Sequence, residues 1–172
     1  LFFMKVIRAE VIGYCEGVRR AVEAAEHALE TYRDCSVYTL GPLIHNQTAL
    51  DALGKKGLRV LAEKDIASAE NGSVVIIRAH GVPPETVRLL EERGCTVINA
   101  TCTRVTASQN IAAAYAQKGY SVILAGDSNH GEVTGIAGYA GPRFMLVQNR
   151  KEAEAVHIDH DAKAVLLSQT TF

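Results

Sequence analysis

The chain has 172 residues, 48% of them apolar and 22% charged, with a formal net charge of −1 at pH 7. This composition is typical of a globular protein with one large domain or two small ones. The charge balance excludes an obvious nucleic-acid or membrane-surface binder, and no apolar run is as long as a membrane span. The opening LFFMKVIRAE is too short and too soon charged for a secretory signal, so we expect Met4 to be the natural start and the location to be cytoplasmic.

Short β-branched runs alternate with helix-like runs along the chain. The expected strands are residues 5–9, 36–40, 73–79, 96–100, 121–126, 143–147 and 164–168, and the expected helices are residues 17–32, 47–57, 83–94 and 103–119. In the first helix, Val18, Val22, Ala25 and Leu29 are predicted to form the buried face.

The alternation predicts an α/β fold with right-handed βαβ units and mostly parallel sheets. We expect an N-terminal strand and cysteine turn at residues 4–16, a first lobe at 17–100 and a second lobe at 101–172. Because no Pro/Gly/Ser-rich linker separates the lobes, they should pack closely and face a shared cleft.

Four cysteines are present: Cys15, Cys35, Cys95 and Cys102. In a chain without a secretion signal they should stay reduced, and the lack of a CxxC pair argues against a zinc ribbon or a thioredoxin-type site. Cys35 and Cys95 precede strands, and we interpret both as structural. Cys15 and Cys102 instead lie between a strand and a helix, although either could still be a small buried apolar residue.

Reactive side chains follow one predicted strand after another. They are Cys15, His45, His80, Cys102, His130 with Glu132, and Thr170 with Thr171. The carboxyl ends of parallel strands meet at one edge of a sheet, where ligands bind. Helix N-termini at this edge favour a thiolate or a bound phosphate, and Gly13 and Gly17 would let the chain bend sharply around Cys15.

Each of these residues also has a simpler interpretation. His45 could cap the following helix, His80 could complete a turn, and Glu132 could be an ordinary first-turn carboxylate. Thr170 and Thr171 could be polar residues at a strand end. The remaining ionisable groups that we considered are expected on solvated surfaces: His27, His157, His160, Arg19 and Arg20.

Six motifs in order, GYCEGVRRAV, GPLIHN, RAHGVPPE, ATCTRVT, HGEVTG and SQTT, together resemble the 4-hydroxy-3-methylbut-2-enyl diphosphate reductase (LytB/IspH) family from Lys5 to Thr171. The resemblance implies reductive removal of the hydroxyl of an allylic diphosphate, giving isopentenyl and dimethylallyl diphosphates in the last step of the non-mevalonate isoprenoid pathway. It also implies a ferredoxin or flavodoxin as electron donor.

The resemblance further implies a [4Fe–4S] cluster held by three cysteines, of which Cys15 matches the first and Cys102 the second. His45, His80 and His130 match the histidines that hold the diphosphate and hydroxyl ends of the substrate. Glu132 matches the acid that supplies protons, and Thr170 matches a threonine beside the substrate.

The sequence departs from the family pattern in three ways. It stops at Phe172, before the third lobe, the third cysteine ligand and the serine- and asparagine-rich segments. Thr103 and Gly131 stand where proline is usual. We therefore expect a truncated reductase that is inactive alone, with a labile cluster and with the 5–9 strand displaced or paired with another molecule.

Two other functions remain open from the residues. Cys15, Cys102 and two histidines could form the metal site of a zinc- or iron-dependent hydrolase. Alternatively, the chain could be a non-catalytic module that binds a diphosphate and keeps that affinity when both cysteines become serine.

Overall fold

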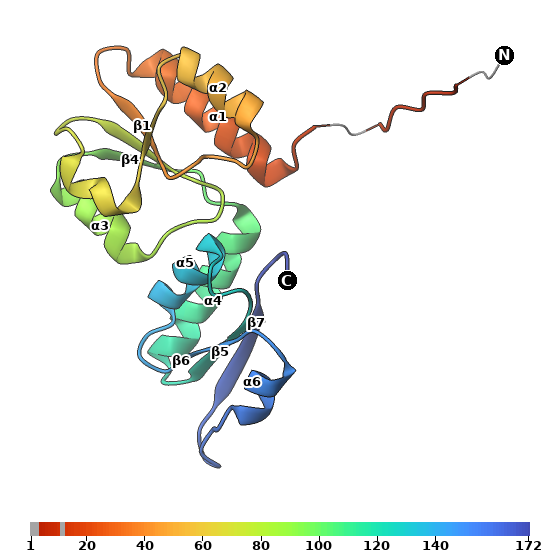
Figure 1. Ribbon diagram of the computed structural model, residues 1–172. Helices are drawn as coiled ribbons and strands as arrows, with labels where there is room; N and C mark the ends of the chain where they lie inside the picture. The colour runs from red at the N-terminus through yellow and green to blue at the C-terminus, as the bar shows by residue number, and fades with distance from the viewer. Residues whose placement is uncertain (1–3, 11–12) are drawn as a thin grey trace.

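The computed structural model describes residues 4–10 and 13–172. The predicted first strand at residues 5–9 is wrong. These residues form neither helix nor strand, and Val6 and Ile7 are 73% and 78% exposed. Figure 1 shows this segment leading away from the rest of the molecule. A strand needs a neighbour to pair its backbone groups, and apolar character alone does not provide one.

The first sheet has four parallel strands in the order β2-β1-β3-β4. They are β1 (Val37–Leu40), β2 (Arg59–Leu61), β3 (Val74–Ile77) and β4 (Thr96–Asn99). The central strands β1 and β3 are buried along their whole length, which explains their continuous apolar sequences. The sequence did not predict β2, a three-residue edge strand whose Arg59 and Val60 are exposed.

Helices cover both faces of this sheet (Figure 1). They are α1 (Glu16–Thr31), α2 (Gln47–Lys55), the 3₁₀ helix η1 (Glu63–Ser68) and α3 (Pro84–Glu92). Successive residues of β3 alternate between the two sides. Val74 and Ile76 pack in the core beside α1 and α2, whereas Val75 and Ile77 pack in the core with Leu90 of α3.

The buried face of α1 differs from the predicted one. Its buried residues are Gly17, Ala21, Ala25 and Ala28, while Val18, Val22 and Leu29 are only partly buried at its flank. Only Ala25 belongs to both sets. Small side chains along one stripe let the helix axis approach its neighbours closely, and the larger apolar residues then fill the edges of the contact.

The second sheet has three parallel strands in the order β6-β5-β7. They are β5 (Ser121–Ala125), β6 (Phe144–Val147) and β7 (Ala164–Ser168), accompanied by α4 (Thr103–Gln117), α5 (Gly131–Tyr139) and α6 (Arg150–Ala155). Val122 and Leu124 form its core with Ala112 of α4 and Ile136 of α5. The sequence did not predict η1, α5 or α6 as helices. The helix α6 has only six residues and is capped locally by Asn149.

Two parallel α/β sheets confirm the predicted fold class, and the chain passes from the first sheet to the second through residues 100–102. The division into lobes at residues 100 and 101 stays a prediction. In the described part of the chain, no helix has both the length and the apolar character to cross a membrane.

Candidate active site

Three imidazoles meet between the two sheets. His45 follows β1, His80 follows β3, and His130 follows β5 as the N-cap residue of α5. The ring centroid of His80 lies 5.3 Å from that of His45 and 4.9 Å from that of His130. The expectation that polar residues after successive strands come together therefore holds for these rings.

The environment of His80 favours the neutral ring. Burial is the main cause that lowers the pKa of His80 to about 4, and the positive charges of His130, Arg78 and His45 lower it further. His80 is therefore uncharged at pH 7. An anion placed beside this ring would act in the opposite direction and favour the imidazolium.

The histidines line a cavity of about 250 Å³. Its residues come from both lobes: His45, Glu63, Arg78, His80, Asn129, His130, Gly131 and Thr134. This cavity is the shared cleft that the sequence predicted. Within the described chain, Glu63 supplies the only carboxylate of this lining, so the walls are rich in groups that can donate to an anion.

Sequence reasoning missed Arg78 in this lining. Its side chain is 19% exposed, and its Nη2 lies 2.8 Å from Glu63 Oε1. The available signal was its position, because Arg78 directly follows the buried strand β3 and precedes His80 by two residues. A charged residue at the end of such an apolar strand points to the edge where ligands bind.

Glu132 is 1% exposed and is held by the end of β7. Its Oε1 accepts the backbone N–H of Thr170 at 2.9 Å, and its Oε2 accepts the Thr170 hydroxyl at 2.8 Å. Its own N–H donates to His130 Nδ1 at 3.2 Å, which leaves Nε2 of a neutral His130 as the protonated nitrogen. Glu132, His130 and Thr170 thus form one connected group.

Gln169 is a second residue that the sequence did not single out. It is 6% exposed, its Oε1 accepts the Asp127 N–H at 2.9 Å, and its Nε2 donates to Thr171 Oγ1 at 3.0 Å. Gln169 therefore fixes the loop after β5 against the end of β7. The same role explains Thr171 as a structural partner in this contact.

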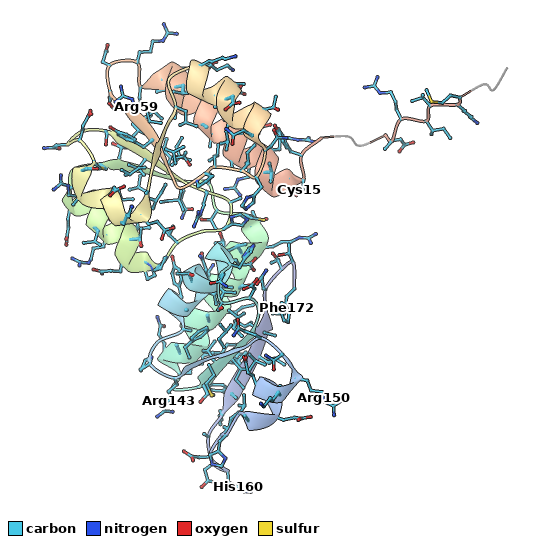
Figure 2. The ribbon with its side chains drawn as sticks, viewed as in Figure 1. Cys15, Arg59, Arg143, Arg150, His160 and Phe172 are labelled. Atoms are coloured by element: carbon cyan, nitrogen blue, oxygen red, sulfur yellow. The ribbon has the colours of Figure 1, made fainter. Side chains whose placement is uncertain are left out.

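Cys15 and Cys102 occupy the N-cap positions of α1 and α4. Figure 2 shows Cys15 at the point where the chain enters α1. Neither side chain makes a capping hydrogen bond, Cys15 is exposed, and Cys102 is partly buried. Both sulfurs are thus available to a ligand, and each lies at the N-terminus of a helix.

The predicted role of Gly17 is wrong, since it lies inside α1 rather than in a bend before it. A Cβ atom at Gly17 would lie 2.8 Å from Cys102 Sγ, so this glycine allows α1 to pack directly on the second cysteine. Gly13, with φ of +99°, does provide a turn before Cys15. The close contact at Gly17 brings the two cysteine-bearing helix starts together.

The other cysteines and histidines lie elsewhere. Cys95 is buried with its sulfur 3.5 Å from Ser73 Oγ, whereas Cys35 is exposed and fills no core position. His27, His157 and His160 are exposed, as expected. Among residues 4–10 and 13–172, no three His, Cys, Asp or Glu side chains are grouped to hold a metal ion.

Residues 6–172 match the family model described as "LytB protein". A 4-hydroxy-3-methylbut-2-enyl diphosphate reductase of Treponema denticola is 44% identical over 176 residues, covering 98% of this chain and 61% of the relative. That of Treponema pallidum (strain Nichols) is 42% identical over 206 residues, covering 98% and 54%. This chain thus spans somewhat more than half the length of the curated relatives that it matches.

Two solved structures share the fold. One is the E-1-hydroxy-2-methyl-but-2-enyl-4-diphosphate reductase of Plasmodium falciparum, with a TM-score of 0.87 and 28% identity, covering 93% of this chain and 49% of that one. The other is described as (E)-4-hydroxy-3-methyl-but-2-enyl diphosphate reductase, the terminal enzyme of the non-mevalonate pathway, with a TM-score of 0.82 and 34% identity. It covers 97% of this chain and 58% of that structure.

Proposed function

Because the chain belongs to the LytB protein family, we propose that it supplies the substrate cavity and two cluster ligands of a 4-hydroxy-3-methylbut-2-enyl diphosphate reductase. The observation that carries this proposal is the meeting of three imidazoles in one cavity between the lobes, close to a carboxylate that is held by the SQTT segment. The reaction converts the allylic alcohol to isopentenyl and dimethylallyl diphosphates. It consumes two electrons and two protons and releases the hydroxyl as water.

His45, His80 and His130 would bind the substrate's diphosphate and hydroxyl ends. Imidazole N–H groups donate to phosphate oxygens, and the N-termini of α2 and α5, with their free backbone amides, lie within two residues of His45 and His130. The burial that keeps His80 neutral also strengthens its hydrogen bond to a bound anion.

Glu132 would deliver a proton to the leaving hydroxyl. It is buried, and Thr170 holds both of its oxygens. Its backbone also contacts His130. This arrangement fixes the direction of the carboxyl group before substrate binds, which is what a general acid requires. Thr170 would position both Glu132 and the neighbouring substrate.

Cys15 and Cys102 fit an iron–sulfur cluster as two thiolate ligands, since neither sulfur is used in capping and both adjoin helix amides. When bound, a [4Fe–4S] cluster would supply electrons received from a ferredoxin or flavodoxin, in the cytoplasm. The third cysteine of the family pattern has no counterpart in this chain. The chain alone is therefore expected to hold the cluster weakly and to be inactive.

Anaerobic reconstitution with iron and sulfide tests this function. The wild-type chain should become brown with broad visible absorbance, and Cys15→Ser or Cys102→Ser should lose most of this absorbance. Cys35→Ser is the matched control, because Cys35 is also an exposed cysteine but lies at the other end of the strands. A colourless protein that still binds pyrophosphate would instead favour the diphosphate-binding module.

A further inference from the structure

Among the described residues that line the cavity, Arg78 is the only arginine or lysine. It follows β3, and its guanidinium is paired with Glu63 at the start of η1 (Nη2 to Oε1, 2.8 Å). The two partners differ in exposure, with 19% for the Arg78 side chain and 42% for that of Glu63. The arginine is thus part of the cavity wall, whereas the glutamate reaches it from the solvent side.

Two glycines make room for this guanidinium. A Cβ at Gly41, which follows β1 with φ of +68°, would lie 2.6 Å from Arg78 Nη1. A Cβ at Gly131, the first residue of α5, would lie 2.9 Å from Nη2. The guanidinium therefore lies against bare backbone from both lobes, and side chains at either position would have to displace it.

The hydrogen-bonding capacity of Arg78 is only partly used. Its Nε is buried and meets no acceptor among the described residues. Glu63 is its only ion-pair partner in the same part of the chain, and an ion pair with a half-exposed carboxylate contributes little net stability. A planar guanidinium with free N–H groups is well suited to bind two phosphate oxygens together.

We propose that Arg78 binds the diphosphate of the substrate and that Glu63 occupies its guanidinium until the substrate arrives. This inference rests on the proposed function, because it assigns a further binding group to the same cavity. Exchange of partners releases Glu63 to water, where its charge is well solvated. It replaces one monodentate carboxylate contact with a phosphate contact beside His45 and His80.

Titration calorimetry of the 172-residue chain with inorganic pyrophosphate, at pH 7 and low ionic strength, tests the exchange. Glu63→Gln removes the competing charge and should tighten binding about two- to fivefold. Glu26→Gln is the matched control, since Glu26 is also 42% exposed and pairs with Lys56 at 2.6 Å outside this cavity. It should leave the affinity unchanged.

Arg78→Gln should weaken pyrophosphate binding by about tenfold or more, because a charge-assisted contact is lost. Arg78→Lys keeps the charge without the planar fork and should fall between wild type and Arg78→Gln. In the active complete reductase, Arg78→Gln should raise KM with kcat nearly constant. A purely structural role for Arg78 would not produce this pattern. If Arg78→Gln does not fold, the Glu63→Gln result still decides the question.

Unchanged affinity in Glu63→Gln and in Arg78→Gln, with weaker binding in His80→Gln, would overturn this inference and leave the proposed function intact. Weaker rather than tighter binding in Glu63→Gln would also overturn it, since Glu63 would then help to bind the anion. If pyrophosphate does not bind the wild-type chain, the inference fails, and the cluster reconstitution decides the proposed function separately.

Discussion

The polar groups at the two ends of the first sheet differ in how far their hydrogen bonds and charges are satisfied by neighbouring side chains. At the amino ends of the strands, a hollow of about 640 Å³ includes Ser36, Arg59 and Glu70 on its wall. There Glu70 accepts from the hydroxyls of Ser36 at 2.8 Å and Tyr38 at 3.2 Å, and Arg59 lies 3.8 Å away. At the carboxyl ends, the smaller cavity contains a half-buried neutral His80 and an arginine with an unused donor.

The difference shows that the volume of a cavity alone does not identify the substrate-binding site. In the larger hollow, the Glu70 carboxylate already has local partners in Ser36, Tyr38 and Arg59. In the smaller cavity, the histidine and the arginine are partly buried, and both could form hydrogen bonds with a bound anion. Helix N-termini point toward the same edge of the sheet. Substitutions at the two ends should therefore have very different consequences.

The largest contrast should appear between two glutamates. Glu132→Gln keeps the size of the buried side chain but removes the acidic proton, so turnover of the complete reductase should fall about 100-fold or more. Glu70→Gln at the opposite end should leave turnover unchanged. Loss of substrate is measured under anaerobic conditions with a reduced one-electron donor. Near-normal turnover in Glu132→Gln would remove this residue as the proton source.

A pair of glycines tests whether the contact between α1 and Cys102 is needed. Gly17→Ala places a Cβ 2.8 Å from Cys102 Sγ and should destabilise the chain by about 1–3 kcal/mol through overpacking. Gly54→Ala in α2 meets nothing within 4 Å and should stabilise it by about 0.5–1 kcal/mol. Urea unfolding measures both. Equal stability of the two variants would show that α1 can move away from Cys102 without loss of folding free energy.

The same glycine shows what could be predicted from sequence. The order of strands and helices follows from local patterns, and the proximity of His45 and His80 follows from the rule that parallel strands of one sheet share a carboxyl edge. His130 follows a strand of the second sheet, so its approach to His80 depends on how the two sheets pack. The contact of Gly17 with Cys102 joins residues 85 positions apart (102 − 17). It depends on how α1 lies on the sheet, and no local pattern contains that information.

Two other differences have equally physical reasons. Residues 5–9 have the composition of a strand, but strand formation depends on a neighbour that supplies hydrogen bonds, so the prediction failed. Arg78 was overlooked because its partners Gly41, Glu63 and Gly131 lie on three separate segments. Its position after β3 was the one local signal, and its contacts with these segments depend on how they pack around one cavity.

The pH dependence of stability should also separate the two ends of the sheet. The pKa of His80 is lowered to about 4 from an ordinary 6.5, so the unfolded chain binds more protons between these values. His80 therefore destabilises the fold progressively as pH falls from 6.5 toward 4, with no effect above 6.5. After allowance for solvent screening, His80→Gln should reduce the fall in Tm over this range by about 2–4 °C.

The control for the pH measurement is His27→Gln, which changes an exposed histidine on α1. Its melting curve should keep the wild-type pH dependence. Pyrophosphate should raise the pKa of His80 in the wild-type chain and reduce the loss of stability at low pH, because a bound anion favours protonated His80. Proton uptake on binding, measured in two buffers of different ionisation enthalpy at pH 6, should therefore decrease in His80→Gln. Equal uptake in both proteins would place the proton on another group.

The smallest effect is expected at the amino ends of the strands. The hydroxyls of Ser36 and then Tyr38 lower the pKa of Glu70, and nearby Arg59 adds to this, so its stabilising contribution is present above the ordinary value of 4.5 and is lost as pH falls. Because Glu70 is exposed, Glu70→Gln should change Tm at pH 7 by no more than about 2 °C. Its pyrophosphate affinity should equal that of wild type. A clear loss of affinity would mean that the two ends of the sheet are coupled, and the cavity could then no longer be treated as an independent site.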